Sequence, residues 1–286
     1  MVPSLLTELF LPLALGVIML GLGLSLTAAD FRRVLVVPRA VLIGLGCQVV
    51  LLPLVCFGIA KAFGLPPVLA VGLMLLAAAP GGAVANLFSH LAHGDVALNV
   101  TLTAVNSVLS LVTLPLVVGL SVSHFLGVHH HIPMQPSKVV TVFLLVIVPI
   151  ALGMLVRARR SDIAARMGRP VKLLSAVFLL LVIVFAVIKE RASLGPAFRA
   201  VGLPALVFNL SSLSVGYLVP RALRLEKRQA TAIGMEIGIH NGTLAIAVAN
   251  NVLGNSAMAL PAAIYSLIMF FTAAGFGWLV RGSEPA

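Results

Sequence analysis

The chain has 286 residues, of which 60% are hydrophobic and only 9% are charged. Soluble domains carry about 25% charged residues, so this composition excludes an ordinary soluble protein and indicates an integral membrane protein. The net charge of +11 does not indicate nucleic-acid binding, because the lysines and arginines lie between hydrophobic runs and form no patch interleaved with aromatic residues.

Apolar windows of about 20 residues, the length that crosses a bilayer as a helix, predict an all-α membrane protein with nine spans. The predicted spans are 4–26, 40–63, 67–91, 95–119, 139–157, 171–189, 200–219, 228–250 and 260–280. No lysine or arginine precedes Arg32. The first span therefore lacks the basic start of a signal peptide, and we expect it to be retained.

Basic residues are distributed unequally between the two sets of connections. The connections after the odd-numbered spans, together with the C-terminus, hold 14 of the 19 lysines and arginines. Cytoplasmic loops carry an excess of these residues. We therefore expect a multi-pass protein of the plasma or inner membrane, with its N-terminus outside and its C-terminus in the cytoplasm.

The second span, 40–63, has a lone amide, Gln48, in a run of valine and leucine. The third span, 67–91, is interrupted in its middle by Pro80-Gly81-Gly82. One interpretation of the interruption is a simple proline kink, because proline removes a backbone donor and glycine loosens the helix. The other is a discontinuous helix, since irregular backbone at membrane depth is tolerated where protein or a water-filled cavity covers it. Asn86 would then supply a polar group one turn further on.

The fourth span, 95–119, carries a polar stripe. Asn99, Thr103 and Asn106 are spaced four and three residues apart, so they share one face of a helix. One interpretation is that these residues, and Gln48 likewise, only form hydrogen bonds between helices. The other is that they line a polar site.

The eighth span, 228–250, contains the one deeply placed acid, Glu236. An ionisable side chain at membrane depth costs about 2.5–3.5 kcal/mol or more, so it indicates a functional site. Gly238 and Gly242 loosen the helix, and His240 and Asn241 add polar groups. Together these features favour a binding site for a cation.

Interruptions at corresponding places in two halves of a chain are typical of secondary transporters with inverted repeats. Matching the first four spans with the last four would give parallel copies. A repeat of five spans, with one helix missing before the first span, gives inverted copies and still pairs the third span with the eighth. We favour the inverted arrangement, because two broken helices that cross from opposite sides aim their ends at one midplane site.

Four segments resemble the bile acid:sodium symporter family: LPLALGVIMLGLGLSLTAADF, PGGAVAN, HGDVALNVTLTAVNS and EIGIHNGTLAIAVA. The resemblance covers nearly the whole chain. It implies a member with nine helices rather than ten, two crossing discontinuous helices, and two domains. The core domain would comprise approximately 40–119 and 200–280, and the panel domain approximately 1–39 and 139–190.

The resemblance also implies two sodium sites that share one acid. The first would use Asn86, Asn99, Thr103 and Glu236, with Ala85 where the family often has serine. The second would use Gln48, Glu236, the backbone of Ile237 and Ile239, and His240 where the family often has glutamine. His240 offers nitrogen rather than the hard oxygen that an alkali cation prefers, and histidine titrates near neutral pH.

The function implied is sodium-coupled symport of a small organic anion, bile-acid-like or pantoate-like, by alternating access. Sodium would offset the charge of the anion, and helix N-termini favour anionic groups; Asn241 and Thr243 would contact the substrate. The alternative is a proton-coupled organic anion transporter of the same fold. An intramembrane enzyme is disfavoured, since no GxSxG motif occurs. A channel is disfavoured because it would not need a coupling acid. We expect no enzymatic activity, no nucleic-acid ligand and no required protein partner.

Overall fold

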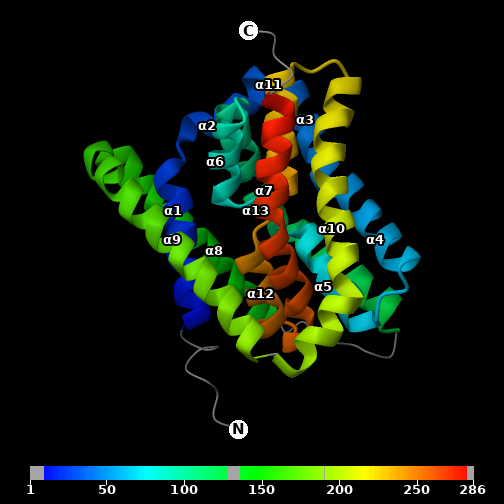
Figure 1. Cartoon of the computed structure of the whole chain (residues 1–286). Helices are drawn as coiled ribbons and strands as arrows, with labels where there is room; N and C mark the ends of the chain where they lie inside the picture. The colour runs from blue at the N-terminus through cyan, green and yellow to red at the C-terminus, as the bar shows by residue number, and fades with distance from the viewer. Residues whose placement is uncertain (1–9, 128–135, 190, 282–286) are drawn as a thin grey trace.

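The computed structural model describes residues 10–127, 136–189 and 191–281. Over these ranges the chain is helical, and its extended pairing consists of one isolated bridge. The all-α fold is therefore confirmed. Helix lies within each of the nine ranges predicted as spans, although the predicted first span begins at residue 4, ahead of the described residues. Figure 1 shows the helices gathered into one bundle.

The N-terminal helix is followed by a sharp bend. α1 (Leu11–Ser25) and α2 (Ala28–Val36) meet at an angle of 61°. Thr27 and Asp30 form a capping box at the start of α2, in which the Thr27 backbone N–H donates to the Asp30 carboxylate at 2.7 Å. Such a box satisfies backbone donors that the bend exposes, so α2 starts as a separate helix and does not continue α1.

The second predicted span consists of three helical pieces: α3 (Pro38–Gly46), the π-helical segment η2 (Cys47–Leu51) and α4 (Leu52–Ala62). The Leu52 N–H donates to the Cys47 carbonyl, five residues back, which is the π pattern. Pro53 follows and has no N–H to donate. Gln48 therefore lies in a locally widened turn, a feature that often occurs at functional sites.

Two spans are broken. The third contains α5 (Pro67–Ala78) and α6 (Ala83–Leu91), and the eighth contains α11 (Lys227–Gly238) and α12 (Gly242–Asn251). The other elements are α7 (Val96–Phe125), α8 (Pro136–Arg159), α9 (Ser161–Lys189), α10 (Arg191–Ala222), the 3-10 turn η3 (Ser256–Ala259) and α13 (Leu260–Arg281).

Within the described part of the chain, four continuous helical stretches are long and apolar enough to cross a membrane. They are Pro38–Ala62, Val96–Phe125, Gly195–Ala222 and Ser256–Arg281, and the bent pair α1–α2 makes a possible fifth. The count of nine spans stays a prediction. α1 begins and α13 ends at opposite ends of the bundle (Figure 1), as an odd number of crossings requires.

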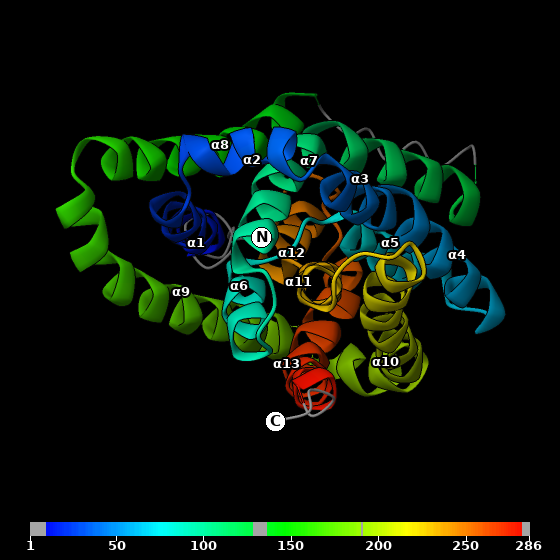
Figure 2. The ribbon, with the colours of Figure 1, turned by 90° about the horizontal axis from the view of Figure 1, so that it is seen from above.

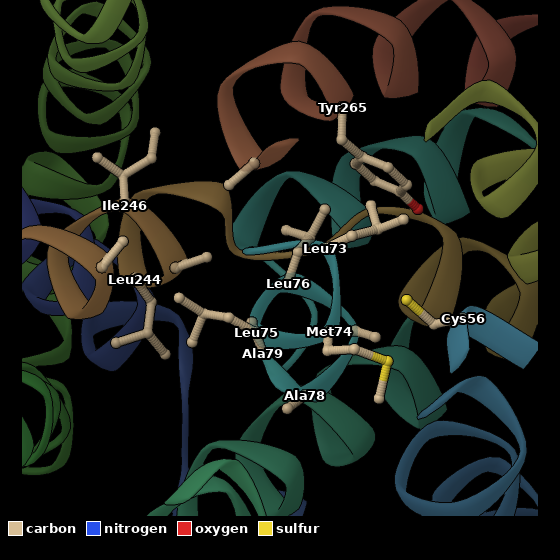
Figure 3. Close-up of a cluster of buried hydrophobic side chains, with 14 of the residues drawn as sticks. Cys56, Leu73, Met74, Leu75, Leu76, Ala78, Ala79, Leu244, Ile246 and Tyr265 are labelled. Atoms are coloured by element: carbon tan, nitrogen blue, oxygen red, sulfur yellow. The ribbon is translucent and has the colours of Figure 1, made fainter. Parts of the chain in front are cut away.

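Viewed along the bundle (Figure 2), α1, α8 and α9 form a group on one side, and the remaining helices cluster around α5, α11 and α12. Glycines allow α1 and α8 to pack closely, because a Cβ added at Gly23 or Gly153 would overlap the backbone of the other helix. α5 lies at the centre of the larger group, where every residue from Leu69 to Ala78 is buried. Figure 3 shows its side chains against those of α12 and α13.

Candidate functional site

The two helix breaks cross and bind each other through their backbones. The Gly82 N–H donates to the Ile239 carbonyl at 3.0 Å, and the Asn241 N–H donates to the Pro80 carbonyl at 2.9 Å. Gly81 and His240 form the antiparallel bridge between them. The interpretation of Pro80 as a simple kink is therefore wrong, because the backbone on both sides of the crossing leaves the helical conformation and pairs with the other break.

The crossing brings four helix ends together. α5 and α11 end there, and their last carbonyls carry partial negative charge; α6 and α12 begin there, and their first N–H groups carry partial positive charge. The Asn241 side chain caps α12 by accepting from the Leu244 N–H at 3.0 Å. The crossing can therefore favour a cation on one side and an anion on the other.

Glu236 lies in the last turn of α11 and is fully buried. Thr103 donates a hydrogen bond to its Oε2 at 2.6 Å, and Asn106 and the Gly81 backbone also face the carboxylate. The carboxylate occupies the place that a Cβ at position 81 would need. Glycine at 81 therefore permits the acid to approach the broken backbone of α5 and α6.

Several buried oxygens have no hydrogen-bond partner among the described residues. Three belong to residues predicted for the first sodium site: Oδ1 of Asn86, Oδ1 of Asn99 and Oε1 of Glu236, here named the open oxygens. The orientation of the Asn99 amide is fixed, because its Nδ2 donates to the Ala232 carbonyl at 2.7 Å. Buried acceptors without a donor are rare and cost free energy. The open oxygens can therefore accept a hydrogen bond or bind a cation.

The residues of the predicted first site fit sodium. They offer one carboxylate, two amide oxygens and the Thr103 hydroxyl, all hard oxygen donors of the kind an alkali cation prefers. They come from α6, α7 and α11, which are in contact with one another. Ala85, beside Asn86, is buried and adds no side-chain ligand.

The residues of the predicted second site fit sodium less well. The His240 ring is buried and lies almost parallel to Phe208, with ring centroids 5.7 Å apart and an interplanar angle of 14°. Tyr265 packs beside it at 5.3 Å. The Ile239 carbonyl already accepts from Gly82. The predicted second site therefore offers an imidazole packed against aromatic rings in place of an oxygen ligand.

The backbone carbonyl of Gly238 lies between the two proposed backbone ligands, Ile237 and Ile239, and it also accepts hydrogen bonds. The Gly238 carbonyl accepts from the Tyr265 hydroxyl and from Asn209 Nδ2, each at 2.9 Å. Thr272 in turn donates to the Asn209 amide oxygen. The sequence analysis missed Asn209, Tyr265 and Phe208. Asn209 could have been found, because it is the lone amide in the seventh predicted span. Nothing in the sequence pairs the two aromatic residues with His240.

Gln48 reaches the crossing from η2. Its Nε2 donates to the carbonyls of Ala77 and Ala79, at 3.3 and 3.0 Å, so its side chain lies against the broken end of α5. Thr243, in the first turn of α12, is buried. The structure thus brings Gln48, Glu236 and His240 to the same crossing.

Comparison with known proteins agrees with this architecture. The model of the sodium bile acid symporter family matches residues 12–195. The chain is 30% identical to an uncharacterized sodium-dependent transporter of Bacillus subtilis, over 93% of this chain and 81% of that protein. It is 25% identical to a probable chloroplastic sodium/metabolite cotransporter of Arabidopsis thaliana, over 95% of this chain and 66% of the relative. It is 32% identical to the human P3 protein, over 74% of this chain and 44% of the relative.

Proposed function

Since this chain belongs to the sodium bile acid symporter family, a family of membrane transporters and not of enzymes, we propose that it is a sodium-coupled symporter of a small organic anion. The observation that carries the proposal is the buried carboxylate of Glu236 on α11, together with the open oxygens of Asn86 and Asn99 on two helices that contact α11. A buried negative charge needs a compensating positive one, and these ligands are suited to sodium.

The crossing supports a coupled mechanism. Sodium at the first site would draw α6, α7 and α11 into one arrangement, because each supplies a ligand to it. The N-termini of α6 and α12 begin at the same crossing and favour anionic groups. The substrate would bind there, near Asn241 and Thr243, as a carboxylate of the bile-acid-like or pantoate-like class. Neutralisation of Glu236 by sodium would remove the repulsion between this acid and the substrate anion.

Alternating access would come from motion of the core domain, 40–119 and 200–280, against the panel domain, 1–39 and 139–190. The separate grouping of α1, α8 and α9 supports this division (Figure 2). The orientation proposed is N-terminus outside and C-terminus in the cytoplasm of the plasma or inner membrane, because most basic residues would then lie inside.

A thermal-shift screen tests the proposed function. We expect sodium to raise the melting temperature of the purified protein, and potassium at equal ionic strength not to raise it. In sodium, we expect one class of anion among bile acids, pantoate and other carboxylates to raise the melting temperature further. A ligand that binds the folded state stabilises it by about 2.7 kcal/mol at 100 times its Kd. Uptake that ignores sodium and follows a pH gradient would instead establish the proton-coupled alternative.

We further propose that one sodium ion binds, at the first site, because aromatic stacking holds His240 in the second. Sodium-driven uptake should then show a Hill coefficient of about 1, and His240→Gln should raise it toward about 2, since Hill coefficients are limited by the number of sites. His90→Gln, at an exposed position on α6, is the matched control and should leave the coefficient unchanged. A coefficient of about 2 in the unaltered protein contradicts this stoichiometry.

A further inference from the structure

A second polar feature lies beside the candidate sodium site. It is a pocket between η2, α5 and α7. Its lining includes Gln48, Pro53, Pro80, Asn106, Ser110 and Thr113. The pocket is lined by amides, hydroxyls and apolar groups, and no charged residue lines it in the described structure. A pocket with this lining suits a polar occupant.

Two buried amides point to such an occupant. Gln48 and Asn106 are 4% and 3% exposed, and Oε1 of Gln48 has no hydrogen-bond partner within the described ranges. Each such group costs about 1–3 kcal/mol when it is left unsatisfied. The Asn106 side chain faces the Glu236 carboxylate, which an amide does with its NH2 end, so its oxygen is left for another partner.

The backbone around the pocket favours positive charge. α5 ends at Ala78, and a helix C-terminus carries about half a negative charge. Pro80 and Pro53, which line the pocket, have no N–H with which to satisfy nearby carbonyls. The pocket therefore combines amide oxygens, hydroxyl oxygens and partial negative charge, which suits a hard cation held weakly.

One face of α7 runs from the candidate site to the pocket. Asn99, Thr103, Asn106, Ser110 and Thr113 are spaced four, three, four and three residues apart, so they form one stripe. Thr103 and Asn106 contact Glu236. Asn106 also lines the pocket together with Ser110 and Thr113. The stripe thus leads from the carboxylate into the pocket.

The stripe leads away from the basic end of the bundle. Asp95 caps the start of α7. Its carboxylate pairs with Arg33 at 3.2 Å, and its N–H donates to the Arg228 carbonyl. Thr113 lies ten residues beyond Thr103, which is about 15 Å along the helix. It is half-buried and lines the pocket. The stripe therefore runs from Glu236 away from the end of the bundle that holds Arg33 and Arg228.

We propose that this pocket is the outer vestibule through which sodium reaches Glu236, exchanging part of its water shell for the oxygens of Gln48, Asn106, Ser110 and Thr113. The inference rests on the proposed function in taking sodium as the coupling ion. Neutral oxygen ligands substitute for water without holding the ion as tightly as the carboxylate does, so the ion can move on.

Thiol labelling tests the vestibule. Thr113→Cys should react with a cationic methanethiosulfonate reagent at least about ten times faster than with an anionic reagent of similar size, because a site of one sign concentrates ions of the other. Sodium, and not potassium, should slow the reaction. Cys47 and Cys56 are buried, at 1% and 0% exposure, so the background in the unaltered protein should be small. Labelling is measured by intact mass.

The control is Thr101→Cys, an equally conservative change on α7. Thr101 is fully buried, donates to the Ala97 carbonyl at 2.8 Å and does not line the pocket, so we expect no labelling there. Equal rates with the two reagents at Thr113→Cys, or rates that sodium does not change, would overturn the vestibule. If sodium still stabilises the unaltered protein in that case, the proposed function stands; if it does not, the proposed function itself fails.

Discussion

Replacing Glu236 with glutamine is expected to abolish sodium-driven uptake and sodium-dependent thermal stabilisation. The change keeps the shape of the side chain and removes the full negative charge from the candidate site. A charge pair at 4 Å is worth about 4 kcal/mol at the effective dielectric constant of a protein interior, which corresponds to about a thousandfold in sodium affinity. Sodium titrations followed by melting temperature measure the change directly.

The same substitution should not harm the fold. Glu236 is fully buried, and burying a carboxylate without a counter-ion costs free energy. In potassium, the Glu236→Gln variant should therefore melt at the same temperature as the unaltered protein or at a higher one. Loss of the sodium response together with an unchanged or raised melting temperature separates a lost ligand from a damaged protein.

Glu226→Gln is the matched control, because Glu226 is exposed at the N-cap of α11. It undergoes the same chemical change about ten residues from the site and should retain full sodium dependence. If sodium stabilises Glu236→Gln as strongly as it stabilises the Glu226→Gln control, Glu236 does not bind the ion and the proposed site is wrong.

The sequence predicted the parts of the site that depend on local chemistry. Proline and glycine at 80–82 specify a break wherever the helix is placed, and a single acid in an apolar span marks the partner break. Residues that recur every three or four positions on α7 share a face whatever packs against them, so the stripe with Asn99 and Thr103 was also predictable. These features require no knowledge of which helices are neighbours.

Features that depend on distant contacts were not predictable. The stacking of His240 on Phe208 joins residues 32 positions apart in sequence, and the two hydrogen bonds to the Gly238 carbonyl come from α10 and α13. The π-helical turn at Gln48 depends on how the chain accommodates Pro53. The sequence analysis therefore identified His240 as a departure from the family pattern but could not show which neighbours hold its ring.

The second large effect is expected at Gly81. An alanine there would place its Cβ on the Glu236 carboxylate and within overlap distance of the Glu236 backbone carbonyl. The carboxylate side chain is flexible, but the carbonyl belongs to α11, and the two breaks are joined by backbone hydrogen bonds on either side. Overpacking of this kind typically costs about 1–3 kcal/mol. Gly81→Ala should therefore lower sodium-driven uptake at least about tenfold.

Gly82 provides the comparison that makes this test specific. A Cβ at position 82 would meet the His240 carbonyl at 3.6 Å, an ordinary contact, so Gly82→Ala should retain most of the uptake and of the sodium-dependent stabilisation. Both substitutions add one methyl group within the same break, and both restrict the backbone in the same way. If the two variants lose activity equally, backbone flexibility explains the loss. If only Gly81→Ala loses activity, the role of Gly81 is to allow Glu236 to approach the crossing closely.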